Sequence, residues 1–291
     1  MNHNASVYWV LLLAYQDFNV GAGLMMIDCH SHLADAAFLE DVDEVIAKAK
    51  AAGVARAVVL PEAFFQFQDV MSLHERHRDF VLPGLGLHPV QMGGSGNFDR
   101  SVLLSDYTEE VTEAILTNQD KLYCIGECGL DFTPYYIKSP DDKLEQKEIL
   151  RNQAKLASHL NLPLNVHSRS AGKHVIDTLE EAGARKVLLH AFDAKVSTAL
   201  KGVELGYYFS IPPSVVRSPQ KQKLVKSIPL THLVLETDSP ALGPEKHGRN
   251  EPVNINVSCD FIAEAKGISR EEVIQMTTEN AQKLFTKLSS Q

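Results

Sequence analysis

The chain has 291 residues, of which 44% are hydrophobic, and its 28 Lys and Arg against 37 Asp and Glu give a formal net charge of −9. This length suits one large domain, and the apolar content excludes a mainly disordered chain. A membrane-spanning protein is excluded because no run of about 18 apolar residues occurs. The four cysteines include no CxxC pair, which excludes a disulfide scaffold and predicts reduced thiols in an intracellular protein, in the cytoplasm, the nucleus or both.

The first 25 residues differ from the patterned remainder of the chain. Residues 6–15 form a short apolar run without the positive flank that precedes it in a secretory signal, although Gly21-Ala22-Gly23 could serve as a cleavage site. We expect residues 1–25 to be a poorly ordered N-terminal extension, with a signal peptide as the alternative. Residues 26–291 are then expected to form one domain.

Short apolar runs and longer amphipathic segments alternate through this domain. A helix is predicted over 41–52, where Gly53 supplies a left-handed stop, and another over 141–160, where Pro140 fits the first turn. Ser269 and Glu272 have the spacing of a capping box for a third helix. Eight strands are predicted. The third ends with residues 84–87, and the other seven lie at 26–30, 56–60, 122–127, 164–167, 187–190, 207–211 and 233–236.

The alternation of eight strands with helices predicts an α/β fold with a parallel sheet that is buried on both faces. We expect a single-domain (β/α)8 TIM barrel, with an open doubly wound sheet as the alternative. Two features favour the barrel. No glycine-rich dinucleotide fingerprint follows the first strand, and polar residues lie at the ends of many strands rather than clustering at one switch point of an open sheet. The functional site is then expected at the C-terminal ends of the strands.

Imidazole and carboxylate side chains occupy these strand ends. They are His30, His32, His88, Glu127, Asp131, His167, His190 and Asp238. Side chains two residues apart on a strand share a face, so His30 and His32 can bind one ion. A lone buried histidine is more often a hydrogen-bonded core residue, but so many such groups on separate strands are costly to bury without a metal. We therefore predict a divalent metal site.

Six motifs in this order resemble the TatD-type metal-dependent deoxyribonucleases, which belong to the amidohydrolase-like barrel superfamily. The motifs are Ile-Asp-Cys-His-Ser-His at 27–32, Gly-Leu-His-Pro at 86–89, Gly-Glu-Cys-Gly-Leu-Asp at 126–131, His-Ser-Arg at 167–169, Glu-Thr-Asp-Ser-Pro at 236–240 and Arg-Asn-Glu-Pro at 249–252. Within the family, Ser-Ile-Pro-Pro at 210–213 and Ala-Leu-Gly-Pro at 241–244 look most like the third TatD-domain paralogue of animals.

The resemblance implies a barrel that holds two or three divalent ions, which could be Zn, Mn or Mg. His30 and His32 would bind one ion, and His167 and His190 the other. Glu127 would bridge the two ions, and Asp238 would complete the first site and touch the attacking water. One departure is His190-Ala191-Phe192-Asp193, where the family more often has His-Cys-Phe followed by a small residue and Gly, so the local turn geometry is in question.

The implied activity is hydrolysis of DNA phosphodiesters by metal-activated hydroxide, as a 3′-exonuclease that could also cut at abasic sites. Asp238 would orient the attacking group, and Arg169 would neutralise charge on the phosphoryl oxygens. His88 would donate a proton to the leaving oxygen or bind a third ion, or would only order a neighbour. Glu236 and Asp131 would orient metal-binding residues. The expected partner is DNA, mainly single strands or 3′ ends, with no membrane, and the expected state is a monomer.

The negative net charge argues against indiscriminate binding of nucleic acid. Local basic residues could still contact phosphates after the seventh and eighth strands, or could form a solvated helix face. The candidates for substrate binding are Arg217, Lys221, Lys223 and Arg249. Few such contacts predict a weak salt dependence of DNA binding.

Two other functions remain open from the residues alone. The first is a related barrel hydrolase of a small amide, lactone or phosphotriester, because the same metal chemistry would serve it. The second is a barrel that acts as a scaffold without turnover, which the complete ligand set disfavours.

Overall fold

The computed structural model of the chain describes residues 25–94 and 96–290. Eight parallel strands follow one another in chain order and form a nearly closed barrel, which confirms the predicted TIM-barrel class. The expected extension at 1–25, except for Met25, lies outside the described residues. The barrel strands are β1 (Met26–Ser31), β2 (Val54–Val59), β3 (Val81–Leu85), β6 (Cys124–Gly129), β7 (Leu164–His167), β8 (Val187–Leu189), β9 (Tyr208–Ile211) and β10 (Leu233–Leu235).

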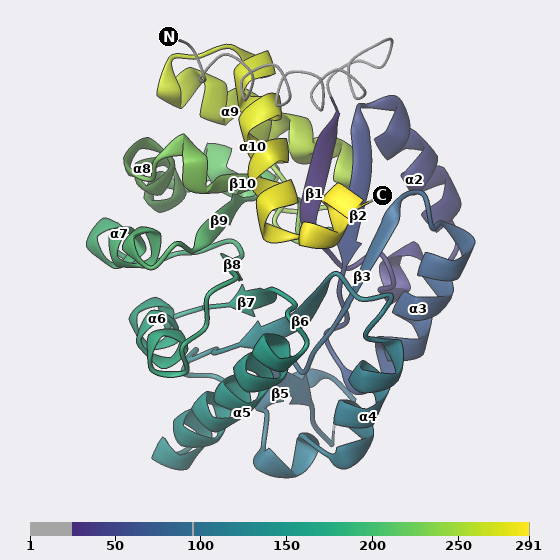
Figure 1. Cartoon of the computed structure of the whole chain (residues 1–291), viewed down its shortest axis with the longest axis vertical. Helices are drawn as coiled ribbons and strands as arrows, with labels where there is room; N and C mark the ends of the chain where they lie inside the picture. The colour runs from purple at the N-terminus through teal and green to yellow at the C-terminus, as the bar shows by residue number, and fades with distance from the viewer. Residues whose placement is uncertain (1–24, 95, 291) are drawn as a thin grey trace, which may run out of the picture.

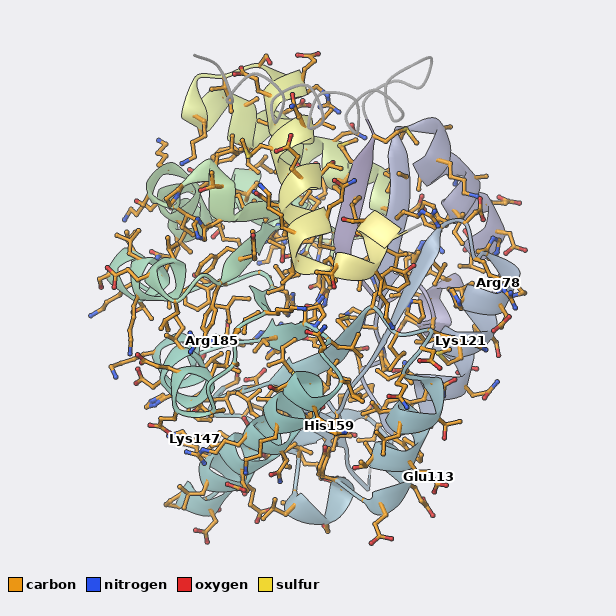
Figure 2. All side chains as sticks on the ribbon, viewed as in Figure 1. Arg78, Glu113, Lys121, Lys147, His159 and Arg185 are labelled. Atoms are coloured by element: carbon orange, nitrogen blue, oxygen red, sulfur yellow. The ribbon has the colours of Figure 1, made fainter. Side chains whose placement is uncertain are left out.

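Helices surround the strands in chain order, so the sheet is covered on its outer face (Figure 1). Charged side chains of these outer segments, such as Arg78 and Glu113, lie at the periphery of the molecule (Figure 2). None of the helices in the described part is long and apolar enough to cross a membrane. The helices are α2 (Val42–Ala51), α3 (Phe67–Arg76), α4 (Glu109–Asn118), α5 (Pro140–His159), α6 (Gly172–Glu181), α7 (Val196–Glu204), α8 (Pro219–Ser227), α9 (Ile255–Lys266) and α10 (Arg270–Leu284).

Local sequence signals explain where the predicted helices begin and end. The buried face of α2 repeats with helical spacing, and Gly53 follows it with φ of +88°. Ser139 caps α5 and Pro140 occupies its first turn, where a missing N–H is tolerated. The capping box of α10 is present, since Ser269 and Glu272 each accept a hydrogen bond from the other's backbone N–H.

The barrel closes at the seam between β1 and the segment that follows β10. The Asp238 N–H donates to the His30 carbonyl at 2.9 Å, and the His32 N–H donates to the Ser239 carbonyl at 2.7 Å. The buried carboxylate of Asp28 also accepts bonds from both the N–H and the hydroxyl of Thr237, at 2.9 and 2.6 Å. These bonds hold the ends of the first and last strands together, and both ends carry predicted metal ligands.

A compact apolar cluster fills the barrel below that end. Residues of the strands, including Cys29, Leu82 and Cys124, pack with Leu284 and Phe285 from the end of α10. Figure 1 shows α10 beside β1, and the helix contacts both β1 and β10. All four cysteines are buried and free, which fits the predicted reduced thiols, and Cys124 and Cys128 pack within strand β6.

One hairpin was not predicted from the sequence. Strands β4 (Val90–Met92) and β5 (Phe98–Ser101) pair antiparallel between β3 and α4. The hairpin follows directly after His88, so it lies beside the expected site.

Candidate metal centre

The six predicted metal ligands come from five barrel strands and meet in one buried cluster. His30 lies in β1, with His32 directly after it; Glu127 lies in β6; and His167 ends β7. The other two, His190 and Asp238, follow β8 and β10. Each of the six is at least nine-tenths buried. The C-terminal ends of parallel strands therefore bring together residues that are up to 208 positions apart.

One half of the cluster is built around His30 and His32. Their Nε2 atoms lie 3.2 Å apart. Asp238 Oδ1 is 3.3 Å from both nitrogens, and Glu127 Oε2 is 3.5 Å from His30 Nε2 and 3.3 Å from His32 Nε2. Four ligand atoms thus converge on one point.

The other half is built around the second carboxylate oxygen of Glu127. Its Oε1 lies 2.9 Å from His167 Nδ1 and 2.9 Å from His190 Nε2. His88 Nε2 is 3.6 Å from the same oxygen, and its ring packs edge-on against the ring of His167. Glu127 therefore presents one oxygen to each pair of histidines, which is the arrangement expected of a residue that bridges two ions.

Hydrogen bonds on the outer nitrogens fix the protonation of the first pair. His32 Nδ1 donates to the Leu60 carbonyl at 3.0 Å, since a carbonyl can only accept. His30 Nδ1 faces Asn165 Oδ1 at 2.8 Å, and the Asn165 amide nitrogen is occupied by the Cys29 carbonyl. In their neutral form, both imidazoles would therefore direct an Nε2 lone pair toward the two carboxylate oxygens. Converging lone pairs of this kind require a cation, so the residues fit a divalent metal ion.

The electrostatics of the protein alone also favour positive charge at this point. Burial would lower the pKa of His30, but the Glu127 charge and hydrogen bonds to Asp238 and Glu127 raise it to about 10. Burial would raise the pKa of Glu127, but the surrounding imidazoles hold it well below its usual range. The pKa of Asp238 is likewise lowered against the effect of burial, by His30 and His32. The carboxylates are thus charged and available as ligands.

Neighbouring acids support the second pair of histidines. Asp131 Oδ2 lies 3.0 Å from His167 Nε2. Glu236 Oε2 lies 3.6 Å from His190 Nδ1, beyond hydrogen-bond distance, and this buried nitrogen has no hydrogen-bond partner among the residues that the structure describes. Glu236 instead accepts bonds from the Ala191 N–H and the Ser210 hydroxyl. Ala191, the position that departs from the family pattern, has a left-handed backbone with φ of +43°.

A pocket of about 160 Å³ opens onto the cluster. Arg169 lines it, with a side chain that is 57% exposed and Nη1 3.8 Å from Asp131. His88 also lines it, and burial lowers the pKa of this imidazole to about 4. Both residues are therefore placed beside the ligands, as the sequence predicted.

Residues that the sequence reasoning missed also line or support the site. Glu62 follows β2, as the predicted ligands follow other strands, and lines the pocket with its pKa raised by burial. Phe98 of the unpredicted hairpin and Tyr136 line it too. Asn165 lies two residues before His167 on the same strand, a spacing that could have indicated it.

The predicted basic residues do not form one exposed patch. Arg217 and Lys223 are exposed. Arg249 is paired with Asp41 and Glu251. Lys221 is buried at 7% exposure, and its ammonium bonds to the Ala191 carbonyl, so it belongs neither to a surface patch nor to a solvated helix face.

Comparison with known proteins gives consistent similarities over nearly the whole described chain. A family model described as TatD related DNase matches residues 27–286. The human protein named Deoxyribonuclease TATDN3 is 54% identical over 268 residues, which cover 92% of this chain and 97% of the human one. A Bacillus subtilis protein named Uncharacterized metal-dependent hydrolase YabD is 35% identical and covers 90% of this chain and 99% of its own.

Solved structures agree in fold. The crystal structure of YjjV, a TatD homologue from Escherichia coli, has a TM-score of 0.77 and 25% identity and covers 90% of this chain and 98% of that one. A TatD-family hydrolase from Entamoeba histolytica has a TM-score of 0.78 at 19% identity and covers 91% of this chain and 99% of that one. The second similarity concerns the fold alone.

Proposed function

The chain belongs to the TatD-related DNase family, and from this premise we propose that it is a metal-dependent deoxyribonuclease. Its substrate would be DNA, mainly single strands or 3′ ends, from which it would act as a 3′-exonuclease with abasic-site cleavage as a further activity. The human relative at 54% identity carries the name of a deoxyribonuclease, which supports DNA as the substrate.

The observation that carries the proposal is the position of Glu127 between two groups of histidines. Its Oε2 faces His30 and His32, and its Oε1 faces His167 and His190. This arrangement favours two divalent ions, one on each side of the carboxylate, with Asp238 as a further ligand on the first side. Ions bound there would supply Lewis-acid activation of water and would neutralise charge at a phosphodiester.

The remaining side chains are placed to assist that reaction. Asp238 Oδ1 faces the centre of the first half and would accept a hydrogen bond from the attacking water. The exposed guanidinium of Arg169 would bind the phosphoryl oxygens from the pocket side. His88 would hold or pass a proton at Nε2. When the Val90 N–H donates to His88 Nδ1, at 3.1 Å, the neutral ring carries its proton at Nε2, on the side of the site. Asp131 would keep the His167 imidazole oriented through Nε2, and Glu236 would hold the backbone of the turn that carries His190 through the Ala191 N–H.

The expected setting of the enzyme follows from the same features. We expect an intracellular protein, in the cytoplasm, the nucleus or both, because its four cysteines are free and buried. We also expect a monomer, which sedimentation of the purified protein would test. The metal is proposed to be Zn, Mn or Mg, and metal analysis of the purified protein would distinguish them.

The proposal is tested with 3′-end-labelled single-stranded DNA and the protein loaded with Zn, Mn or Mg in parallel. We expect stepwise shortening from the 3′ end, and a loss of more than 100-fold in the rate with Glu127→Ala or Asp238→Asn. Near-normal hydrolysis by either variant at saturating metal would contradict the mechanism. Hydrolysis of a panel of small esters and lactones, with no cleavage of DNA, would instead indicate a small-molecule hydrolase.

A further inference from the structure

The turn that carries His190 is held through both backbone groups of the residue that follows it. The Ala191 N–H donates to Glu236 Oε1 at 2.9 Å, and the Ala191 carbonyl accepts from Lys221 Nζ at 2.5 Å. Ala191 has φ of +43°, a left-handed conformation that a residue with a Cβ adopts only at some cost. The two bonds therefore hold a backbone conformation that the local sequence does not itself favour.

Lys221 reaches this carbonyl from the first turn of α8. The neighbouring Gln220 donates in the same way to the Ala194 carbonyl at 2.5 Å. The first turn of α8 thus contacts the segment between β8 and α7 at two of its carbonyl groups. Ser218 fixes the start of the helix by capping the Lys221 N–H, so the position of the ammonium is tied to the backbone.

The placement of Lys221 is unfavourable unless it serves this contact. Its side chain is 7% exposed, and it sits at the positive end of a helix dipole. Burial lowers the pKa of Lys221, although Asp193, Glu236 and Asp238 act against that effect. Within residues 25–94 and 96–290, no ion pair joins it to a carboxylate. Its hydrogen bond to the Ala191 carbonyl is then the contact that offsets the burial of the charge.

We propose that Lys221 is a positioning residue for His190: by fixing the Ala191 carbonyl, it directs the His190 imidazole toward Glu127 and so sets the affinity of the second metal ion. His190 needs such support because, in the described part of the chain, no hydrogen-bond partner of its Nδ1 orients the ring from behind. The inference rests on the proposed metal-dependent function, and it replaces a phosphate-binding role for this lysine by a role inside the protein.

The test is metal binding by the Lys221→Met variant, measured by competition with a chromophoric chelator for Zn²⁺. We expect a loss of about 10–100-fold in affinity at one ion and an unchanged affinity at the other. Lys226→Met is the matched control, because it removes the same charge from an exposed position of the same helix. Lys221→Arg, which keeps N–H donors and charge, is expected to restore most of the affinity.

A second variant covers the case in which removal of the buried ammonium unfolds the chain. Lys221→Gln keeps an N–H donor on a shorter side chain, so we expect folded protein with an intermediate loss of affinity at the same ion. Wild-type affinity in either folded variant would overturn the proposal, as would an equal loss at both ions. The salt dependence of DNA binding is expected to be unchanged in Lys221→Met, whereas a slope reduced by about 1 would indicate a phosphate contact instead.

Failure of this inference and failure of the proposed function can be told apart. Zn²⁺ binding is measured without DNA. A wild-type protein that cleaves no DNA would therefore refute the nuclease activity, while the Zn²⁺ affinities of the Lys221 variants would still test the positioning role. Conversely, an active nuclease in which Lys221→Met binds both ions normally would refute the positioning role alone.

Discussion

At the scale of single residues, the ability of this chain to bind metal depends on which nitrogen of each imidazole carries the proton. For His32 the Leu60 carbonyl decides this, and for His30 the Asn165 side chain does. Asn165 makes a second bond to the Cys29 carbonyl, so its amide cannot rotate without losing one partner. Asn165, an uncharged residue, therefore couples the orientation of the His30 ring to the position of the β1 backbone.

Replacing Asn165 with Leu should weaken both metal binding and folding. His30 would lose the acceptor that fixes its ring, and we expect an affinity for Zn²⁺ at least about 10-fold lower. The buried Cys29 carbonyl would be left without its donor, and the free energy of unfolding should fall by about 1–3 kcal/mol. Chelator competition and urea unfolding of the metal-free protein measure the two effects.

The matched control for Asn165→Leu is Asn118→Leu, at the end of α4. Asn118 donates to the Ala114 carbonyl of its own helix, away from the histidines. This variant should lose stability but keep the wild-type affinity for Zn²⁺. Equal metal affinity in both variants would contradict the role assigned to Asn165.

Sequence patterns identified the candidate ligands well because ligands in this fold follow buried strands, and buried strands are visible as apolar runs. His167 and His190 could be placed in this way before any coordinates were known. Glu62 could not, because carboxylate groups near strands are common and only their spatial neighbours distinguish them. Asn165 shares the face of His167 on β7, but that spacing alone does not show its bond to His30. Lys221 was misplaced for a similar reason, since its burial arises from packing against the β8–α7 segment.

At the scale of whole elements, a capping box fixes the start of α10, the helix whose last residues pack into the interior of the barrel. The hydroxyl of Ser269 accepts the Glu272 N–H, and α10 then packs on β1 and β10 and contributes Leu284 and Phe285 to the interior cluster. The start of α10 is thus fixed by a local signal, and its end by long-range packing.

Ser269→Ala should lower the free energy of unfolding by about 1 kcal/mol, because one N–H of the first turn of α10 loses its acceptor. We expect a lower midpoint of urea unfolding, with an unchanged dependence of the unfolding free energy on urea concentration. Ser227→Ala is the control, because that exposed hydroxyl bonds only the Lys223 carbonyl in its own helix; its effect should stay within about 0.5 kcal/mol. Equal midpoints for the two variants would show that the cap contributes nothing.

Helices with a clear start or stop signal were predicted to within one residue at each end, such as α2 with Gly53 and α5 with Pro140. Strand β6 was predicted two residues too early, at 122–127, because Leu122 and Tyr123 extend its apolar run. The hairpin of β4 and β5 was missed because its strands are short and partly polar, so neither gives the alternating pattern of a strand.

At the scale of the whole molecule, the distribution of charge argues for a limited contact with DNA. A net charge of −9 gives the chain no general attraction for a polyanion. Of the four basic residues predicted to bind substrate, Lys221 is buried and Arg249 is paired with two acids. Arg217 and Lys223 remain exposed, and Arg169 lines the pocket.

DNA binding by the metal-loaded Asp238→Asn variant, which should bind without rapid turnover, is therefore expected to depend weakly on salt. Neutralisation of two or three phosphates by exposed cations predicts a slope of about −2 for log K against log salt on single strands. Arg217→Ala and Lys223→Ala should each reduce that slope, whereas Lys155→Ala, an exposed cation on α5, should not. A slope steeper than about −5 would mean that many more phosphates are contacted. Such a result would mean that the enzyme encloses a long segment of DNA rather than binding the end of a strand.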